Sequence, residues 1–129
     1  MVTKFENKII KMEIIDDIMH ATYKKGMKIT LPDAQNIVNE RINLLGGKIL
    51  PTIVFDGGVV RLDKAARDFF SSDEGTQGIK CVAIVQSSMF SKMLVNFFLK
   101  ITKPKIKVKA FDNSKDAITW LNTQKSNSF

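Results

Sequence analysis

One segment of the chain, residues 78–121, joins four hydrophobic patterns of different period without a gap. Cys81–Val85 is apolar throughout, which favours a β-strand covered on both faces. Residues 106–111 alternate apolar residues with lysine, which favours a strand at a sheet margin with one face packed and one in water. Between them, apolar side chains recur at helical spacing, at Phe90, Met93, Leu94, Phe97, Phe98 and Ile101. With a last helix anchored by Ala117, Trp120 and Leu121, the segment predicts a β-α-β-α unit.

The first part of the chain predicts a hairpin followed by a helix. Lys8–Ile15 and Ile18–Tyr23 alternate as strands do, and Asp16-Asp17 between them is a turn sequence. Thr30 is placed to cap a helix with Pro32 and Asp33 in its first turn, and Gly46-Gly47 end that helix. Its buried stripe is predicted to hold Ala34, Ile37, Val38 and Leu45.

The middle of the chain predicts one more strand and one more helix. Thr52–Phe55 is the strand, and Asp56, Gly57 and Gly58 close it. Asp63 is placed to cap the helix that follows, in which Ala66, Phe69 and Phe70 point inward. The whole order is β-β-α-β-α-β-α-β-α. It predicts an α/β fold with a mixed sheet, an N-terminal hairpin and later parallel strands.

Length and composition favour one domain in a reducing cytoplasm. The 129 residues bury a core of ordinary size, and we expect a single domain over residues 1–124 with a frayed tail at 125–129. No apolar segment approaches the roughly 18 residues that a membrane-spanning helix needs. The lone cysteine, Cys81, cannot form an internal disulfide. The sequence therefore predicts a cytoplasmic protein without a transmembrane segment.

This order of elements resembles the STAS fold, the small domain of sporulation anti-sigma-factor antagonists, and its cousins among the CRAL-TRIO lipid-binding proteins. The chain also contains Gly75–Gly78 leading into Val82–Val85, then Asn96–Lys100, Lys103-Pro104 and Ala117–Leu121. In these segments it is similar to a group of small uncharacterised bacterial STAS-like proteins. The resemblance spans roughly residues 6–122.

The resemblance implies a regulatory module that binds a protein partner. In STAS antagonists an Asp-Ser pair begins the helix after the strand equivalent to Thr52–Phe55, and that serine is the phosphorylation switch. Here the helix begins Asp63-Lys64, so a lysine stands where the serine would be and the switch is predicted to be absent. We expect the docking surface to comprise Asp56, Gly57, Gly58, Arg61, Asp63 and Lys64. The identity of the partner stays open, as does a homodimer.

The sequence offers little to support catalysis or metal binding. A nucleophile activated by an imidazole needs a histidine within reach, and the only histidine, His20, is expected in the hairpin. Cys81 sits in an apolar run, where burial raises the pKa of a thiol and makes it inert. One histidine and one cysteine are too few for a structural zinc site. We therefore predict a protein that is not an enzyme and holds no cofactor or metal.

Two other binding functions remain open. The broad apolar stripe of residues 90–101 would suit a carrier of a small apolar or lipid-like ligand if part of it were exposed. The excess of 20 Lys and Arg over 13 Asp and Glu, a net charge of +7, favours acidic partners. Lysines gather near the last strand, at Lys103, Lys105, Lys107 and Lys109, and could bind phosphates or anionic lipid. A basic patch without aromatics for base stacking disfavours direct nucleic-acid recognition.

Overall fold

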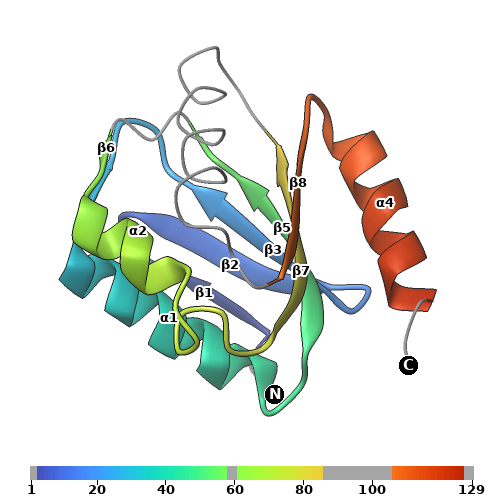
Figure 1. Ribbon diagram of the computed structural model, residues 1–129, viewed down its shortest axis with the longest axis horizontal. Coiled ribbons are helices and arrows are strands. Elements are labelled where there is room, and N and C mark those ends of the chain that lie inside the picture. The colour runs from blue at the N-terminus through green and yellow to red at the C-terminus, as the bar shows by residue number, and fades with distance from the viewer. Residues whose placement is uncertain (1–2, 58–60, 86–105, 127–129) are drawn as a thin grey trace.

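A six-stranded mixed sheet forms the centre of the computed structural model, which describes residues 3–57, 61–85 and 106–126 (Figure 1). Its strands lie in the order β1-β2-β3-β5-β7-β8, with β1 and β8 at the edges. The first three strands pair antiparallel, and β3, β5, β7 and β8 pair parallel. Their bounds are β1 Lys4–Glu6, β2 Ile10–Ile15, β3 Ile18–Tyr23, β5 Leu50–Phe55, β7 Ile79–Val85 and β8 Lys107–Phe111. The predicted mixed sheet, with its N-terminal hairpin and later parallel strands, is confirmed.

Three short strands were not anticipated. β1 adds an outer strand to the hairpin, with only Phe5 of its three residues partly buried. β4 (Lys28–Ile29) and β6 (Arg61–Leu62) pair parallel in a separate two-stranded sheet. Strands of two or three residues are too short to show an alternating pattern, so only tertiary pairing defines them.

The first helix forms as its terminal residues predict. α1 runs Leu31–Leu45 and begins with a capping box, in which the Thr30 hydroxyl accepts from the Asp33 N–H and the Asp33 carboxylate accepts from the Thr30 N–H. It ends at Gly46, which has the left-handed conformation at φ +57°. The expected stripe of Ala34, Ile37, Val38 and Leu45 is buried, and Arg41 is buried with it.

The other described helices depart from expectation in two details. α2 (Lys64–Phe70) starts after Asp63, but the Asp63 side chain makes no capping hydrogen bond. α4 (Ser114–Ser126) continues past the expected start of the frayed tail, and Lys125 Nζ donates to the Asp16 carbonyl at 2.8 Å. The predicted helix over residues 90–101 lies outside the described residues.

Separate apolar clusters pack on the two faces of the sheet. α1 and α2 cover one face, where Ile10, Met12, Met19 and Ala21 meet Ala34, Ile37 and Ala66. α4 covers the other face, where Ala117 and Leu121 pack on Ile18, Ile53, Cys81 and Ala83 (Figure 1). This division follows the two-residue period of the strands, since Ile18 and Met19 point to opposite faces.

Candidate functional site

The surface at the start of α2, expected as the docking surface, is assembled at the carboxyl end of β5. We call it the α2 entry surface and define it as Asp56, Gly57, Arg61, Asp63 and Lys64; Gly58 was also predicted here but lies outside the described residues. Asp56 follows β5 and its N–H donates to the Val85 carbonyl at 3.4 Å. Asp63 N–H donates to the Ile29 carbonyl at 3.1 Å, which ties the start of α2 to β4.

The two cations of the α2 entry surface are exposed and sit beside carboxylates. The Lys64 side chain is 77% exposed at the first position of α2, and its Nζ lies 2.7 Å from Asp68 Oδ2. The Arg61 side chain is 67% exposed, and its Nε lies 3.5 Å from Asp63 Oδ1. Asp63 therefore faces Arg61 and leaves the helix N–H groups uncapped by its side chain. The surface presents paired charges of both signs rather than a positive patch.

The lysines expected to bind anions are described only in part. Lys107 and Lys109 are exposed on β8, an edge strand, as the alternation predicts. Lys109 Nζ lies 5.4 Å from the centre of the Phe111 ring, a cation–π arrangement. Lys103 and Lys105 lie outside the described residues.

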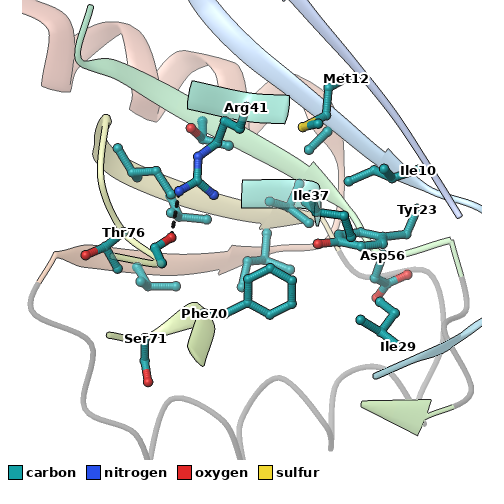
Figure 2. A pocket seen from close by; sticks show the side chains of 18 of the residues that line it. Ile10, Met12, Tyr23, Ile29, Ile37, Arg41, Asp56, Phe70, Ser71 and Thr76 are labelled. Carbon is teal, nitrogen blue, oxygen red and sulfur yellow. Dashed lines mark hydrogen bonds between the residues drawn. The ribbon is translucent and has the colours of Figure 1, made fainter. Parts of the chain in front are cut away.

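A pocket of about 200 Å³ lies against the sheet face that carries α1 and α2 (Figure 2). Its walls come from β2, β3, β5, β7 and β8 of the main sheet, from the short strands β4 and β6, and from α1 and α2, and they are largely apolar. Among the lining residues are Met12, Ala21, Ile37, Val54, Phe70, Val82 and Ile84. A concave, mostly apolar site with a few polar groups is the usual form of a small-molecule site.

Arg41 is the most unusual of the polar residues in this pocket. It reaches from α1 toward residues 75–77, where its Nη2 donates to the Gly75 carbonyl at 2.6 Å and to the Gln77 carbonyl at 3.1 Å (Figure 2). Only 6% of its surface is exposed, and its Nε is buried with no hydrogen-bond partner in the described part of the chain. Burial lowers the pKa of Arg41 to about 10, with nearby Tyr23 opposing that change.

Tyr23 and Asp56 lie toward another part of the pocket, near Ile29 (Figure 2). Burial raises the pKa of Tyr23 to about 12, and the Arg41 cation reduces that rise. The phenol therefore stays neutral at physiological pH.

His20 and Cys81 are not brought together as a catalytic pair would be. His20 is partly buried on β3, and desolvation lowers its pKa while Glu13 and Asp16 oppose that change. Cys81 is buried between the sheet and α4, and burial raises the pKa of its thiol. Among residues 3–57, 61–85 and 106–126, no group of three His, Cys, Asp or Glu side chains is arranged to hold a metal ion.

Sequence reasoning missed the pocket and Arg41. One signal was available: Arg41 continues the spacing of Ala34, Ile37, Val38 and Leu45 along the apolar stripe of α1. A cationic side chain at a position of the apolar stripe is buried among apolar neighbours unless it extends to solvent. The position of Arg41 in the sequence alone therefore indicates an unusual arginine.

The comparisons with known proteins show the family and the fold. The model of a family described as a domain of unknown function, DUF7793, matches residues 12–125. None of the curated proteins matches this chain. A solved structure of an uncharacterised protein from Shewanella loihica PV-4, of the DUF3478 family and with a SpoIIAA-like fold, is similar with a TM-score of 0.62 and 18% identity, over 94% of this chain and 98% of that one.

A protein of unknown function from Arthrobacter sp. FB24 is 25% identical over 87% of this chain and 92% of that one, with a TM-score of 0.30.

In the part of the chain that the structure describes, no helix is long and apolar enough to cross a membrane. At 18% identity the Shewanella protein is evidence for the fold alone, and that fold is the STAS-like architecture expected from the sequence. The chain belongs to the DUF7793 family and has a SpoIIAA-like α/β fold.

Proposed function

We propose that this protein is a non-catalytic regulatory module that binds a protein partner through the α2 entry surface. The observation that carries the proposal is the exposed Lys64 side chain at the first position of α2. STAS antagonists, which the sequence resembles, carry their phosphorylatable serine at the corresponding helix start. A lysine there keeps a fixed positive charge and cannot be switched by a serine kinase.

The local ion pairs define what such a partner must offer. Arg61 and Lys64 each have a carboxylate neighbour, so an acidic partner would have to compete with Asp63 and Asp68. Exposed ion pairs of this kind contribute roughly 0–1 kcal/mol to stability. Replacing Asp63 or Asp68 with a carboxylate of the partner protein therefore costs little free energy. A partner with charges of both signs fits this surface better than a uniformly acidic one, because it can pair with cations and carboxylates together.

The absence of catalysis is part of the proposal. The thiol of Cys81 is buried with a raised pKa, which disfavours the thiolate that a nucleophile requires. His20 lies on β3 opposite Glu13, and the carboxylates of Glu13 and Asp16 act on its ring electrostatically. We propose the cytoplasm as its location, in keeping with its single free thiol.

The docking proposal is tested by affinity capture from extracts of cells that express the protein, with bound proteins identified by mass spectrometry. Lys64→Glu places two carboxylates side by side in α2 and should abolish recovery of the partner. Lys115→Glu makes the same charge change on α4, on the opposite face of the sheet, and should leave recovery unchanged. Equal recovery with both variants, or no protein recovered by the unmodified chain, would contradict the proposal.

A second candidate function, carriage of a small apolar ligand, is favoured by the pocket of about 200 Å³. Native mass spectrometry of the purified protein should show an additional bound mass. Ala21→Leu adds three carbons to the pocket wall and should remove that mass. A spectrum of the unmodified protein with no adduct, and no uptake of any added apolar compound, would count against a carrier.

A further inference from the structure

The Arg41 guanidinium is a buried cation with no carboxylate partner among the described residues. Its Nη2 donates hydrogen bonds to the carbonyls of Gly75 and Gln77. Across the three described ranges of the chain, no carboxylate lies within ion-pair distance of it. A buried charge that is neither paired nor fully hydrogen-bonded is costly, and proteins usually keep one only with a partner.

The Arg41 side chain lies in the wall of the pocket. Nη2 is held in place by the two carbonyls, and Nε is buried with no hydrogen-bond partner among the described residues. Nη1 is the guanidinium nitrogen that is neither buried nor hydrogen-bonded in the described part of the chain. The guanidinium is therefore fixed in position with a donor still available. Fixed donors of this kind bind carboxylates strongly, because the hydrogen bond is charge-assisted and little side-chain entropy is lost.

The rest of the pocket sets the remaining chemistry. Much of the wall is hydrocarbon, from residues such as Ile37, Val82 and Ile84, and the hydroxyl groups of the lining belong to Tyr23, Thr52, Ser71 and Thr76. Asp56, near Tyr23 and Ile29, would repel an anion placed beside it (Figure 2). An anionic head is thus favoured at Arg41 and disfavoured near Asp56. The volume of about 200 Å³ exceeds the roughly 150 Å³ that accepts benzene.

We propose that the pocket binds a small apolar carboxylic acid, with its carboxylate on Arg41 and its hydrocarbon against the sheet. A saturated chain or an aromatic ring bearing roughly six to eight carbons matches the volume. This inference rests on the carrier function and adds to it the class of ligand and the residue that selects it. Arg41 is the residue that distinguishes an acid from an uncharged molecule of the same shape.

The test compares acids with an uncharged analogue by isothermal titration calorimetry. Octanoate and 4-ethylbenzoate represent the chain and ring forms of the ligand, and 1-octanol is the uncharged probe. The unmodified protein should bind at least one of the two acids tenfold or more tightly than 1-octanol. Arg41→Gln should keep the affinity for 1-octanol and reduce the preference for the acid to near one. Arg61→Gln removes an exposed guanidinium outside the pocket and should preserve the preference.

Nuclear magnetic resonance gives a second readout that needs no variant. The Nε–H resonance of Arg41 should shift on addition of the preferred acid and stay in place with 1-octanol. Equal affinity of the unmodified protein for the acids and the alcohol, or an Nε–H resonance that does not respond to either acid, would overturn the assignment of Arg41 while leaving a carrier intact. Failure of all three probes to bind would overturn both.

Discussion

At the scale of single residues, close backbone approaches decide which positions tolerate change. Gly57 has φ +63°, and a Cβ built on it would collide with the backbone carbonyl of Tyr23. Gly46 has a similar φ of +57°, yet a Cβ there would meet open space. The two glycines share a left-handed conformation and differ in their surroundings. Substituting each with alanine therefore distinguishes the cost of backbone strain from the cost of steric collision.

We expect Gly57→Ala to lower the free energy of unfolding by about 2 kcal/mol or more, because strain and collision add. Gly46→Ala should cost only about 1 kcal/mol, the strain of the left-handed conformation alone. Urea unfolding followed by circular dichroism measures both. Equal losses for the two variants would mean that the chain at Gly57 moves away from Tyr23 without cost, and that the α2 entry surface is not held rigidly at Gly57.

His20 should make stability depend on pH. Its pKa is lowered in the folded protein, mainly by desolvation, so the unfolded chain takes up a proton at higher pH than the folded one. Stability should therefore be complete above the ordinary histidine pKa of about 6.5 and decrease as pH falls through the window below it. Glu13 and Asp16 moderate this loss, because they favour the protonated ring.

Unfolding free energies at pH 7.5 and 5.5, for the unmodified protein and for His20→Gln, test this dependence. The decrease on going to the lower pH should be smaller in His20→Gln, which has no ring to protonate. Both proteins carry the same carboxylates, so the difference between the two decreases reports the presence of the histidine ring. A decrease that is the same or larger in the variant would show that the His20 pKa is not lowered.

At the scale of elements, the two helix starts that looked alike in sequence differ in structure. Thr30 and Asp33 form a reciprocal capping box at α1, whereas Asp63 turns toward Arg61 at α2. We expect Thr30→Ala to cost about 1 kcal/mol of unfolding free energy and Asp63→Ala about 0.5 kcal/mol or less. The same urea measurement applies, and a larger loss for Asp63→Ala would mean that Asp63 caps α2 in solution.

The elements that could be predicted are those with a long hydrophobic period. Five or more residues of consistent hydrophobic pattern are present in each of β2, β3, β7 and α1. The pattern therefore predicts these elements without any knowledge of tertiary contacts. β4 and β6 could not be predicted, because a parallel pair of two-residue strands exists only when residues 28 and 61 are brought together by the fold. The residues of the α2 entry surface are close in sequence, and their role in docking stays a prediction.

The pocket could not be predicted for a different reason. Its lining residues come from positions between 10 and 108, and an empty volume depends on how well side chains fill the space between elements, which no local pattern records. Arg41 was missed because an arginine on a helix is usually solvated. Its burial follows from the carbonyls of Gly75 and Gln77, more than 30 residues away in the chain.

At the scale of the whole molecule, the net charge of +7 competes with local sites as the cause of any binding to anions. The exposed lysines of β8 also protect an edge strand from pairing with another chain, so their presence has a structural explanation. Long-range attraction by net charge depends on the total and is weakened by salt, whereas a site depends on particular side chains. Net charge and a local anion site can therefore be distinguished by removing the same number of charges at two different places on the surface.

We expect the protein to be retained on heparin at about 50 mM salt and released as the concentration rises toward about 200 mM, as non-specific attraction predicts. The double variant Lys107→Gln/Lys109→Gln lowers the formal charge from +7 to +5, and so does Lys11→Gln/Lys115→Gln, which removes exposed lysines from β2 and α4. Both should elute earlier than the unmodified protein and at the same salt concentration. Clearly earlier elution of the β8 variant alone would identify a local anion site on that strand and contradict an origin in net charge.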